Sequence, residues 1–521
     1  MWMLNIYSLI KRKESMKIKH FLLSIGAISV MGTQYTQASI LPLNPKVDRY
    51  VQDQFKSTNQ IKSTILVVLK NQADLSSAES FTSREEKGQY VYDALRNTAL
   101  ATQGPLVNFL QAKKVRFRQF YIENMIAVEN PTADLVTALA ARQDVARIMG
   151  NPNVKLKLPV TKGLLASRAN LAGPEQNLVR VGATKVWENY HVRGEGIVVA
   201  GQDTGVQWDH PALINQYRGT SSKGVDHNYN WHDSIHGPSS LNKTSSRCGY
   251  DTQVPCDDQG HGTHTMGTIV GDDGKGNQIG VAPKAQWMAC KNMDNGIGTP
   301  ASYIECFEFF LAPYPLNGNP LKDGDPAKSP HVINNSWGCE KSEGCEGNEI
   351  LPSLEAMKRA GIFVVASAGN DGPSCSTIDA PPAWHSNLTL SVGAFDHRND
   401  KIASFSSRGP SFLDGGPGPN ISAPGVTIRS SVPGNRYESF IWSGTSMAGP
   451  HAVGATALLW SFNKNLIGNI DQTISIIEKS AEPKTTSESC GGVPGSHIPN
   501  NTYGYGLLNV AQAVASQAGG S

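Results

Sequence analysis

Three short segments carry residue types that together could activate a hydroxyl group. GQDTG holds Asp203 at the end of an apolar run, DDQGHGTHTMGT holds His261, and SGTSMAGPH holds Ser446. A serine hydroxyl is a weak nucleophile at neutral pH and needs a neighbouring base. A histidine can take the proton, and a carboxylate can hold that imidazole in the required tautomer. The three residue types therefore suit nucleophilic attack on an acyl carbon.

Each segment also has a simpler interpretation when it is taken alone. Asp203 could be a turn residue after a strand, and Ser446 could cap a helix. His261 and His264 have a spacing that metal ligands can use, but HExxH is absent and no third ligand is evident in the sequence. Asn370 in VVASAGNDG could be an ordinary turn residue. Taken together, the segments favour the catalytic interpretation.

The elements around these segments must bring distant side chains together. The apolar runs at residues 196–205, 331–338 and 361–370 end in turn residues, which is typical of parallel strands buried on both faces. Helical patterns lie between them, so we expect an α/β fold with a mostly parallel sheet flanked by helices. Functional residues of such sheets gather at the carboxyl ends of the strands.

The serine segment opens a long apolar helix. We expect Ser446 in its first turn, where free backbone N–H groups favour a developing negative charge. Gly444, Ala448 and Gly449 are small enough to let a substrate backbone approach. We expect Pro450 to be tolerated because N–H groups of a first turn have no acceptor within the helix.

DTG, HGTH and GTSMAGPH, in this order, resemble the three signature segments of the subtilase family. The resemblance covers about residues 172–515, and NNSWGCEKSEGC and GNDGPSC are similar to its bacillopeptidase F-like branch. It implies a subtilisin-like fold and a secreted serine endopeptidase that works through an acyl-enzyme. Ser446 would be the nucleophile, His261 the general base and then acid, and Asp203 the residue that orients His261. Asn370 and the Ser446 N–H would form the oxyanion hole.

The resemblance also implies that the substrate backbone is added as a strand between two edges. The residues implied in substrate binding are Gly296, Gly298, Ser336, Trp337, Gly338, Ala368 and Gly369. The side chain before the cut would enter a cleft between SWG and ASAGN. Nothing in SWGCE or ASAGND places an acid clearly at the base of that cleft, and Asp371 should lie near its rim. We therefore expect large apolar residues to be preferred, with basic ones tolerated.

We expect the chemistry to need no cofactor. The sequence departs from the family at two places linked to structural calcium, because it has Ala212 where many relatives have aspartate and Gly274 where asparagine is common. A structural calcium ion stays an open alternative, with Asp272 and Asp273 as candidate ligands.

Residues 39–171 differ in pattern from the rest of the chain. Apolar strands and amphipathic helices follow one another in the order βαββαβ, which predicts a ferredoxin-like α+β domain. The resemblance identifies it as an inhibitory prodomain that the enzyme removes by cutting itself between about Val160 and Ala172. The alternative is a stable N-terminal domain of another use. Residues 172–521 would be the peptidase domain.

Residues 1–38 have the plan of a secretory signal peptide, and translation could start at Met16 instead of Met1. A membrane anchor is disfavoured because the apolar run at residues 21–31 is too short to span a bilayer. We expect an extracellular or periplasmic protein with no membrane contact after cleavage of the signal. The formal net charge of +2 gives no reason to expect a nucleic-acid partner. We expect a monomer whose partners are protein or peptide substrates and its own propeptide.

The eight cysteines fit an oxidising compartment. We expect Cys248–Cys256 and Cys339–Cys345 to form small loop disulfides. Cys290 and Cys306 could be buried thiols or a pair, and the sequence does not fix how Cys375 and Cys490 are connected.

Two other functions are consistent with parts of the sequence. A catalytically silent binding protein could use the same fold, although it would have no need to keep Asp203, His261, Ser446 and Asn370 together. Sedolisin-type acid peptidases share SGTS, but they use glutamate where this chain has His261.

Overall fold

The apolar runs of the sequence form one central sheet of eight strands in the computed structural model. The strand order is β10-β12-β7-β15-β16-β17-β18, with β19 beside β17. The pairs are parallel except β17–β18, which confirms the mostly parallel sheet. The strands span Val198–Asp203 (β7), Trp231–Asp233 (β10), Gln286–Lys291 (β12), Val332–Asn335 (β15), Phe363–Ser367 (β16), Leu390–Asp396 (β17), Lys401–Ile402 (β18) and Ile421–Pro424 (β19).

The structure describes residues 44–56, 60–61, 63–159, 173–242, 246–380, 382–384, 387–411 and 415–518. The predicted signal peptide at 1–38 and the predicted self-cleavage window at 160–172 lie outside these residues. Within the described ranges, none of the helices combines the length and the apolar character that crossing a membrane requires.

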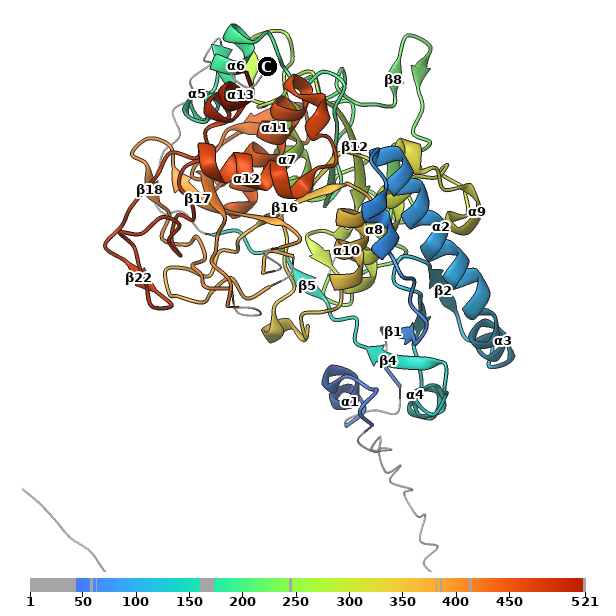
Figure 1. Ribbon diagram of the computed structural model, residues 1–521. Helices are drawn as coiled ribbons and strands as arrows, with labels where there is room; N and C mark the ends of the chain where they lie inside the picture. Colours follow the sequence, from blue (N-terminus) through green and yellow to red (C-terminus); the bar gives the residue numbers. More distant parts are fainter. Residues whose placement is uncertain are drawn as a thin grey trace, which may run out of the picture. The chain divides into compact units, whose positions relative to one another are not determined.

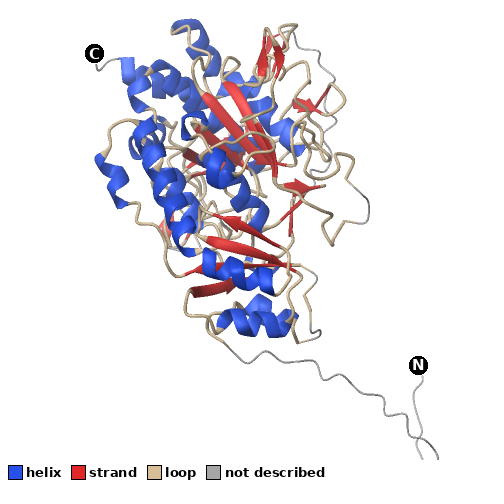
Figure 2. Ribbon diagram, turned by 90° about the vertical axis from the view of Figure 1, so that its right-hand side faces the viewer, coloured by secondary structure: helices blue, strands red, loops and turns tan. Residues whose placement is uncertain are grey.

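Helices cover both faces of the central sheet (Figures 1 and 2). Successive side chains of a strand point to opposite faces, so Val199 and Ala200 of β7 lie in two different apolar clusters. One face packs against α7 (His261–Val270) and α11 (Thr445–Phe462). The other packs against α8 (Pro300–Leu311) and α10 (Leu351–Arg359). Both faces of the sheet are therefore shielded from water by helices, which explains the continuous apolar runs in the sequence.

The N-terminal region forms a separate antiparallel sheet of four strands in the order β2-β3-β1-β4. Together with its helices, these strands follow the predicted βαββαβ order. The elements are α1 (Arg49–Gln54), β1 (Thr64–Leu69), α2 (Arg84–Thr102), α3 (Gly104–Ala112), β2 (Phe117–Phe120), β3 (Met125–Glu129), α4 (Ala133–Ala140) and β4 (Val145–Met149).

The two faces of this smaller sheet have different partners. Val67 lies in a cluster with residues of α3 and α4, whereas Leu66 lies in the cluster that contains α8 and α10. Glu308 of α8 accepts hydrogen bonds from the backbone N–H groups of Tyr121 (2.6 Å) and Ile122 (3.1 Å). The N-terminal sheet thus packs on two helices of the larger region, α8 and α10, through apolar contacts and a buried carboxylate.

Shorter elements complete the chain. The two-residue strands β5 (Val154–Lys155), β13 (Met293–Asp294) and β14 (Ile297–Gly298) form a small three-stranded sheet in the order β13-β14-β5. The remaining helices include α5 (Gln176–Arg180), α6 (Ala183–Asn189), α9 (Pro320–Asp323), α12 (Ile470–Ser480) and α13 (Val510–Ala518). The remaining short strands are β6 (Gly173–Pro174), β8 (Thr220–Ser221), β9 (Gly224–Val225), β11 (Asn277–Gln278), β20 (Ser430–Val432), β21 (Arg436–Glu438), β22 (Ser489–Cys490) and β23 (Val493–Pro494).

All eight cysteines are paired. Both predicted loop disulfides, Cys248–Cys256 and Cys339–Cys345, are confirmed. The pairs that the sequence left open are Cys290–Cys306 and Cys375–Cys490. Cys290–Cys306 ties β12 to α8, and Cys375–Cys490 ties the loop after Asn370 to the C-terminal hairpin of β22 and β23.

Candidate active site

Asp203 ends β7, at the carboxyl edge of the sheet, and its side chain orients His261. The imidazole Nδ1 lies 2.8 and 2.9 Å from the two carboxylate oxygens of Asp203. The backbone N–H of Thr204 donates to the same carboxylate at 2.7 Å. Because Nδ1 is held by a carboxylate, it carries the proton and Nε2 is left as the basic nitrogen.

Asp257 fixes the start of the helix that carries His261, a role that the sequence analysis missed. Its carboxylate accepts from the N–H groups of Gly260 (2.7 Å) and Thr263 (2.9 Å), which have no acceptor within the helix. The Thr204 hydroxyl also donates to Asp257 at 2.8 Å and thereby links the end of β7 to the start of α7. An aspartate just before a helix is a recognised capping signal and could have been found in DDQGHGTH.

A close backbone contact also sets the distance between β7 and α7. A Cβ atom at Gly262 would lie 2.1 Å from the carbonyl oxygen of Gly205, and one at Gly205 would lie 1.8 Å from that of Cys256. Only glycine fits at either position, so the DTG and HGTH segments can approach until Asp203 meets His261.

As expected, Ser446 lies in the first turn of α11. Only 3% of its surface is exposed. Its hydroxyl donates to the carbonyl oxygen of Ser336 at 3.2 Å. Nε2 of His261 has no hydrogen-bond partner among the described residues. The aspartate–histidine half of the triad is therefore assembled, and the serine hydroxyl must turn from Ser336 to His261 before it can transfer its proton.

Pro450 lies inside α11 and not in its first turn, so this part of the sequence prediction is wrong. Proline has no backbone N–H, so the Ser446 carbonyl, four residues earlier, receives no hydrogen bond within the helix. The Ser336 hydroxyl donates to that carbonyl at 3.2 Å instead. The SWG segment thus supports the helix at the nucleophile.

Asn370 follows β16 and points its amide into the cleft. Its Oδ1 accepts from the Thr445 N–H (2.9 Å) and the Thr445 hydroxyl (3.0 Å), which fixes the orientation of the amide. Its Nδ2 donates to the carbonyl oxygen of Lys157 at 3.2 Å. The amide therefore contacts a peptide carbonyl next to Ser446, which is the contact that an oxyanion-hole donor makes.

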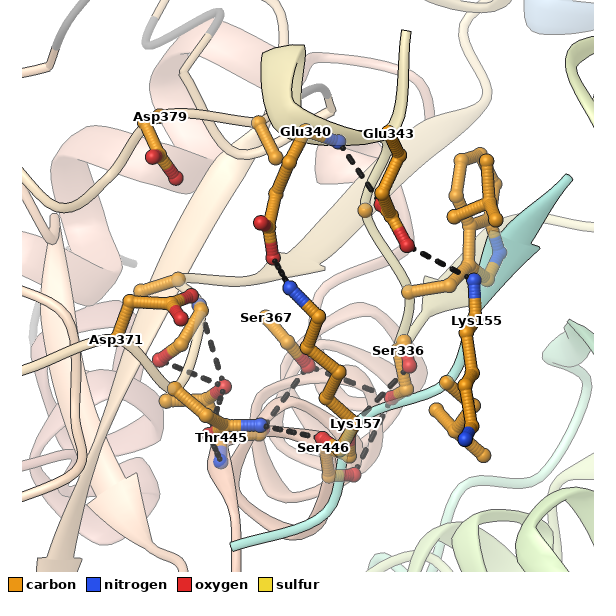
Figure 3. A pocket seen from close by; sticks show the side chains of 18 of the residues that line it. Lys155, Lys157, Ser336, Glu340, Glu343, Ser367, Asp371, Asp379, Thr445 and Ser446 are labelled. Atoms are coloured by element: carbon orange, nitrogen blue, oxygen red, sulfur yellow. Dashed lines mark hydrogen bonds and ion pairs between the residues drawn. The ribbon is translucent and has the colours of Figure 1, made fainter. Parts of the chain in front are cut away.

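Five of the predicted substrate-binding residues line the pocket that also holds Lys157, and Figure 3 shows Ser336 there beside Ser446. This pocket is lined by Ser336, Trp337, Gly338, Ala368, Gly369, Asn370 and Ser446. Gly298 of β14 pairs with Val154 of β5 in an antiparallel ladder, and the Leu156 N–H donates to the Gly296 carbonyl at 2.8 Å. The segment before Lys157 is therefore added as a strand to the predicted glycine-rich edge.

Trp337 belongs to the wall of the pocket. Its ring stacks on Tyr303 with centroids 3.8 Å apart, and its Nε1 donates to the Gln202 carbonyl at 3.2 Å. These contacts fix the indole against the sheet.

Acidic side chains line the same pocket, and they include three acids besides the expected Asp371. Glu340 and Glu343 come from the loop closed by Cys339–Cys345, and Asp371 and Asp379 come from the loop after Asn370. Glu340 was visible in SWGCE, next to the expected edge. Asp379 lies nine residues after Asn370, and nothing in its local sequence signals that the loop returns to the pocket.

His264 is buried and packs inside the domain. Its Nε2 bonds the Ile428 carbonyl at 2.9 Å, and its ring stacks on Trp442 with centroids 4.4 Å apart. Burial lowers the pKa of His264 to about 3, so it is neutral at physiological pH.

The candidate calcium ligands Asp272 and Asp273 already accept hydrogen bonds from the protein. The Asp273 carboxylate accepts from the N–H groups of Lys275 and Asn277, the Asn277 amide and the Tyr437 hydroxyl. These four donors use the lone pairs that a cation would need. Among the described residues, no three His, Cys, Asp or Glu side chains are grouped so that they could hold a metal ion. Asp273 therefore does not fit the role of a calcium ligand in this conformation.

Comparisons with known proteins agree with this geometry. The model of the Subtilase family matches residues 194–506. Bacillopeptidase F of Bacillus subtilis (strain 168) is 37% identical over 462 residues, which are 84% of this chain and 29% of that protein. Serine protease AprX of Bacillus subtilis (strain 168) is 27% identical over 450 residues, 82% of this chain and 86% of that protein. Subtilisin E of the same strain is 32% identical over 285 residues, 54% of this chain and 62% of that protein.

Proposed function

Because the chain belongs to the subtilase family, we propose that it is a serine endopeptidase that cleaves proteins or peptides through an acyl-enzyme. One observation carries this proposal. Asn370 donates to a peptide carbonyl beside Ser446, while Asp203 holds His261 in the basic tautomer. Because the chain spans only 29% of the length of Bacillopeptidase F, the proposal concerns the chemistry of this chain alone.

The reaction follows from the positions of these groups. Ser446 Oγ attacks the carbonyl carbon while His261 Nε2 takes its proton. Asn370 Nδ2 and the first-turn N–H of Ser446 stabilise the negative charge that develops on the carbonyl oxygen. His261 then gives the proton to the leaving amine. In the second half of the reaction water attacks the acyl group, His261 takes a proton from that water, and His261 returns the proton to Ser446 as the acyl group leaves. No step needs a cofactor.

We also propose that the protein is made as a secreted pre-pro-enzyme and that its N-terminal domain inhibits it. The contact of β5 with β14 supports this, because it fills the edge that a substrate would use. The apolar cluster shared by the N-terminal sheet, α8 and α10 supports tight association. The signal peptide predicted at residues 1–38 supports export from the cytoplasm.

A fluorophosphonate probe tests the proposed chemistry. It reacts only with an activated serine, so mass spectrometry of the labelled peptide should place it on Ser446. Ser446→Ala should abolish labelling and peptide-bond hydrolysis while the circular dichroism spectrum stays that of the wild type. In a host without other proteases, the Ser446→Ala precursor should also stay uncut. A folded wild-type protein that is never labelled would be a silent binding protein on the same fold.

A further inference from the structure

The pocket beside Ser446 carries more negative charge than the acyl-transfer chemistry needs. Its lining includes Glu340, Glu343, Asp371 and Asp379, which come from two separate loops. Three of them are partly buried, and Asp371 is exposed. An apolar side chain in this pocket would leave these carboxylates without a partner of opposite charge.

A lysine side chain lies among these acids. The Nζ of Lys157 forms an ion pair with Glu340 at 2.5 Å, and Figure 3 shows the side chain extended towards Glu340 with Asp371 and Asp379 on the neighbouring loop. Partial burial lowers the pKa of the Lys157 amine, but the hydrogen bond and charge of Glu340, with the charges of Glu343 and Asp371, raise it overall. The ammonium form is therefore the form that this pocket stabilises.

The backbone of Lys157 is also in the position of a residue about to be cleaved. The strand that pairs with Gly296 and Gly298 leads directly into it, and its carbonyl accepts from Asn370 at 3.2 Å. The next residue, Leu158, packs against an apolar cluster that includes Trp442 and Met447, the residue that follows Ser446. The Lys157–Leu158 bond is thus the peptide bond presented to Ser446.

We propose that the enzyme cleaves after lysine or arginine, and that its own first cleavage is at Lys157–Leu158. This inference rests on the proposed endopeptidase function. In the self-cleavage, Ser446 Oγ bonds to the Lys157 carbonyl carbon and the bond to the Leu158 nitrogen breaks. His261 delivers to that nitrogen the proton it took from Ser446, and water then converts the acyl-enzyme into the Lys157 carboxylate. The cut precedes the window at 160–172 that the sequence predicted.

Electrostatics explains why a cation is selected. A single partly exposed ion pair contributes little, so Glu340 alone would not set a strong preference. Here the carboxylates also repel one another. Burial, with the charges of Glu340 and Asp371, raises the pKa of Asp379 to about 6, and the charge of Lys157 opposes that rise. A basic side chain relieves this repulsion, whereas an acidic one adds to it.

Two disulfides anchor the loops that carry the acidic residues of the pocket. Cys339–Cys345 closes the loop that carries Glu340, and Cys375–Cys490 anchors the loop that carries Asp379. A preorganised cluster of carboxylates discriminates better than a mobile one, because it does not have to be ordered when the substrate binds.

Self-cleavage gives the first test. Intact mass and N-terminal sequencing of the secreted full chain should show a fragment that ends at Lys157 and a mature protein that begins at Leu158. Lys157→Arg should keep this cut, and Lys157→Glu should slow it at least tenfold. Lys70→Glu is the matched control, because Lys70 is an exposed lysine of the same N-terminal domain, does not line the pocket and should not change the cut. Cleavage of Lys157→Glu at the wild-type rate and position would overturn the inference.

Matched peptides that differ only in the residue before the cut give the second test. We expect kcat/KM to be at least tenfold higher with Lys or Arg than with Leu or Phe, and lowest with Glu. The double variant Glu340→Gln/Asp379→Asn should lower the ratio of Lys to Leu by tenfold or more. Glu188→Gln, an exposed charge on α6 outside the pocket, should leave that ratio unchanged.

The outcomes separate the two proposals. A protein that the fluorophosphonate labels on Ser446 but that prefers Leu or Phe keeps the proposed function and overturns the basic preference. A double variant with the wild-type ratio of Lys to Leu also overturns the role of the acids. A protein that is neither labelled nor active on any peptide overturns both.

Discussion

Asn370 is held so that only one end of its amide can serve the reaction. Thr445 donates twice to Oδ1, which leaves Nδ2 directed at the Lys157 carbonyl. An alanine at this position would still leave the Ser446 N–H, which we propose as the second donor of the oxyanion hole. The contribution of Asn370 should therefore appear in the transition state, where the carbonyl oxygen becomes an anion, more than in substrate binding.

Asn370→Ala should lower kcat by roughly 10²–10³-fold with little change in KM, a magnitude that comes from the equivalent donor in subtilisin, a relative of this chain. Steady-state kinetics on a single lysine peptide would measure both constants. Asn465→Ala, at an exposed position outside the pocket, should behave as the wild type. A large rise in KM with an unchanged kcat would mean that Asn370 serves binding.

At the scale of elements, the loop between β10 and α7 is fastened to β12 by a buried ion pair. Lys291 Nζ lies 2.7 Å from Asp258, and both side chains are fully buried. The same Nζ donates to the carbonyl oxygens of Thr204 (2.7 Å) and Met293 (2.6 Å). Lys291 therefore joins the end of β7, the loop before α7 and the start of β13. The first two of these segments flank Asp203 and His261.

Lys291→Met should lower the free energy of unfolding by about 3–5 kcal/mol, because it leaves Asp258 buried without its partner. Chemical denaturation in the Ser446→Ala background, which prevents autolysis, would measure this. Lys284→Met is the matched control, since Lys284 pairs with Glu195 at 3.2 Å on the surface and should cost about 0–1 kcal/mol. Equal effects of the two substitutions would contradict this account.

At the scale of the whole molecule, buried carboxylates make the association of the N-terminal domain depend on pH. Glu308 contacts the β2–β3 turn, and Glu123 of that turn accepts from the N–H of Ser353 at 3.2 Å, at the start of α10. Burial raises the pKa of both carboxyl groups from 4.5 to about 8. Nearby Glu305 and Glu349 add to the rise.

The sign of the effect follows from that rise. A group whose pKa is raised in the folded state contributes stability that is fully present below its ordinary pKa and is lost as the pH rises through the raised value. The contact between the two domains should therefore weaken between about pH 4.5 and pH 8. Alkaline conditions would favour release of the N-terminal domain.

Thermal unfolding of the intact Ser446→Ala precursor from pH 5 to pH 9 would measure this dependence. We expect Tm to fall with rising pH, and to fall less in Glu308→Gln, which keeps an acceptor for Tyr121 and Ile122 but cannot ionise. Glu188→Gln on the surface should keep the full slope. The same slope in the precursor and in Glu308→Gln would mean that other groups cause the dependence.

Much of the candidate site could be predicted from the sequence because its signals are local. Asp203, His261, Ser446 and Asn370 each stand in a short segment where a strand or turn meets a helix, and the structure brings these segments together. The two parts of the fold could be predicted for the same reason, since apolar periodicity reports which faces of each element are buried.

What the sequence left open depends on residues that meet only after folding. Asp379, Glu340 and Lys157 come from three distant segments, so no local pattern could show that they share one pocket. Cys375 and Cys490 are likewise 115 residues apart. The sequence by itself therefore determined the chemistry, since motifs encode the reacting groups. Only the tertiary structure decided which side chain that chemistry receives, because the charge of a pocket is the sum over all the loops that reach it.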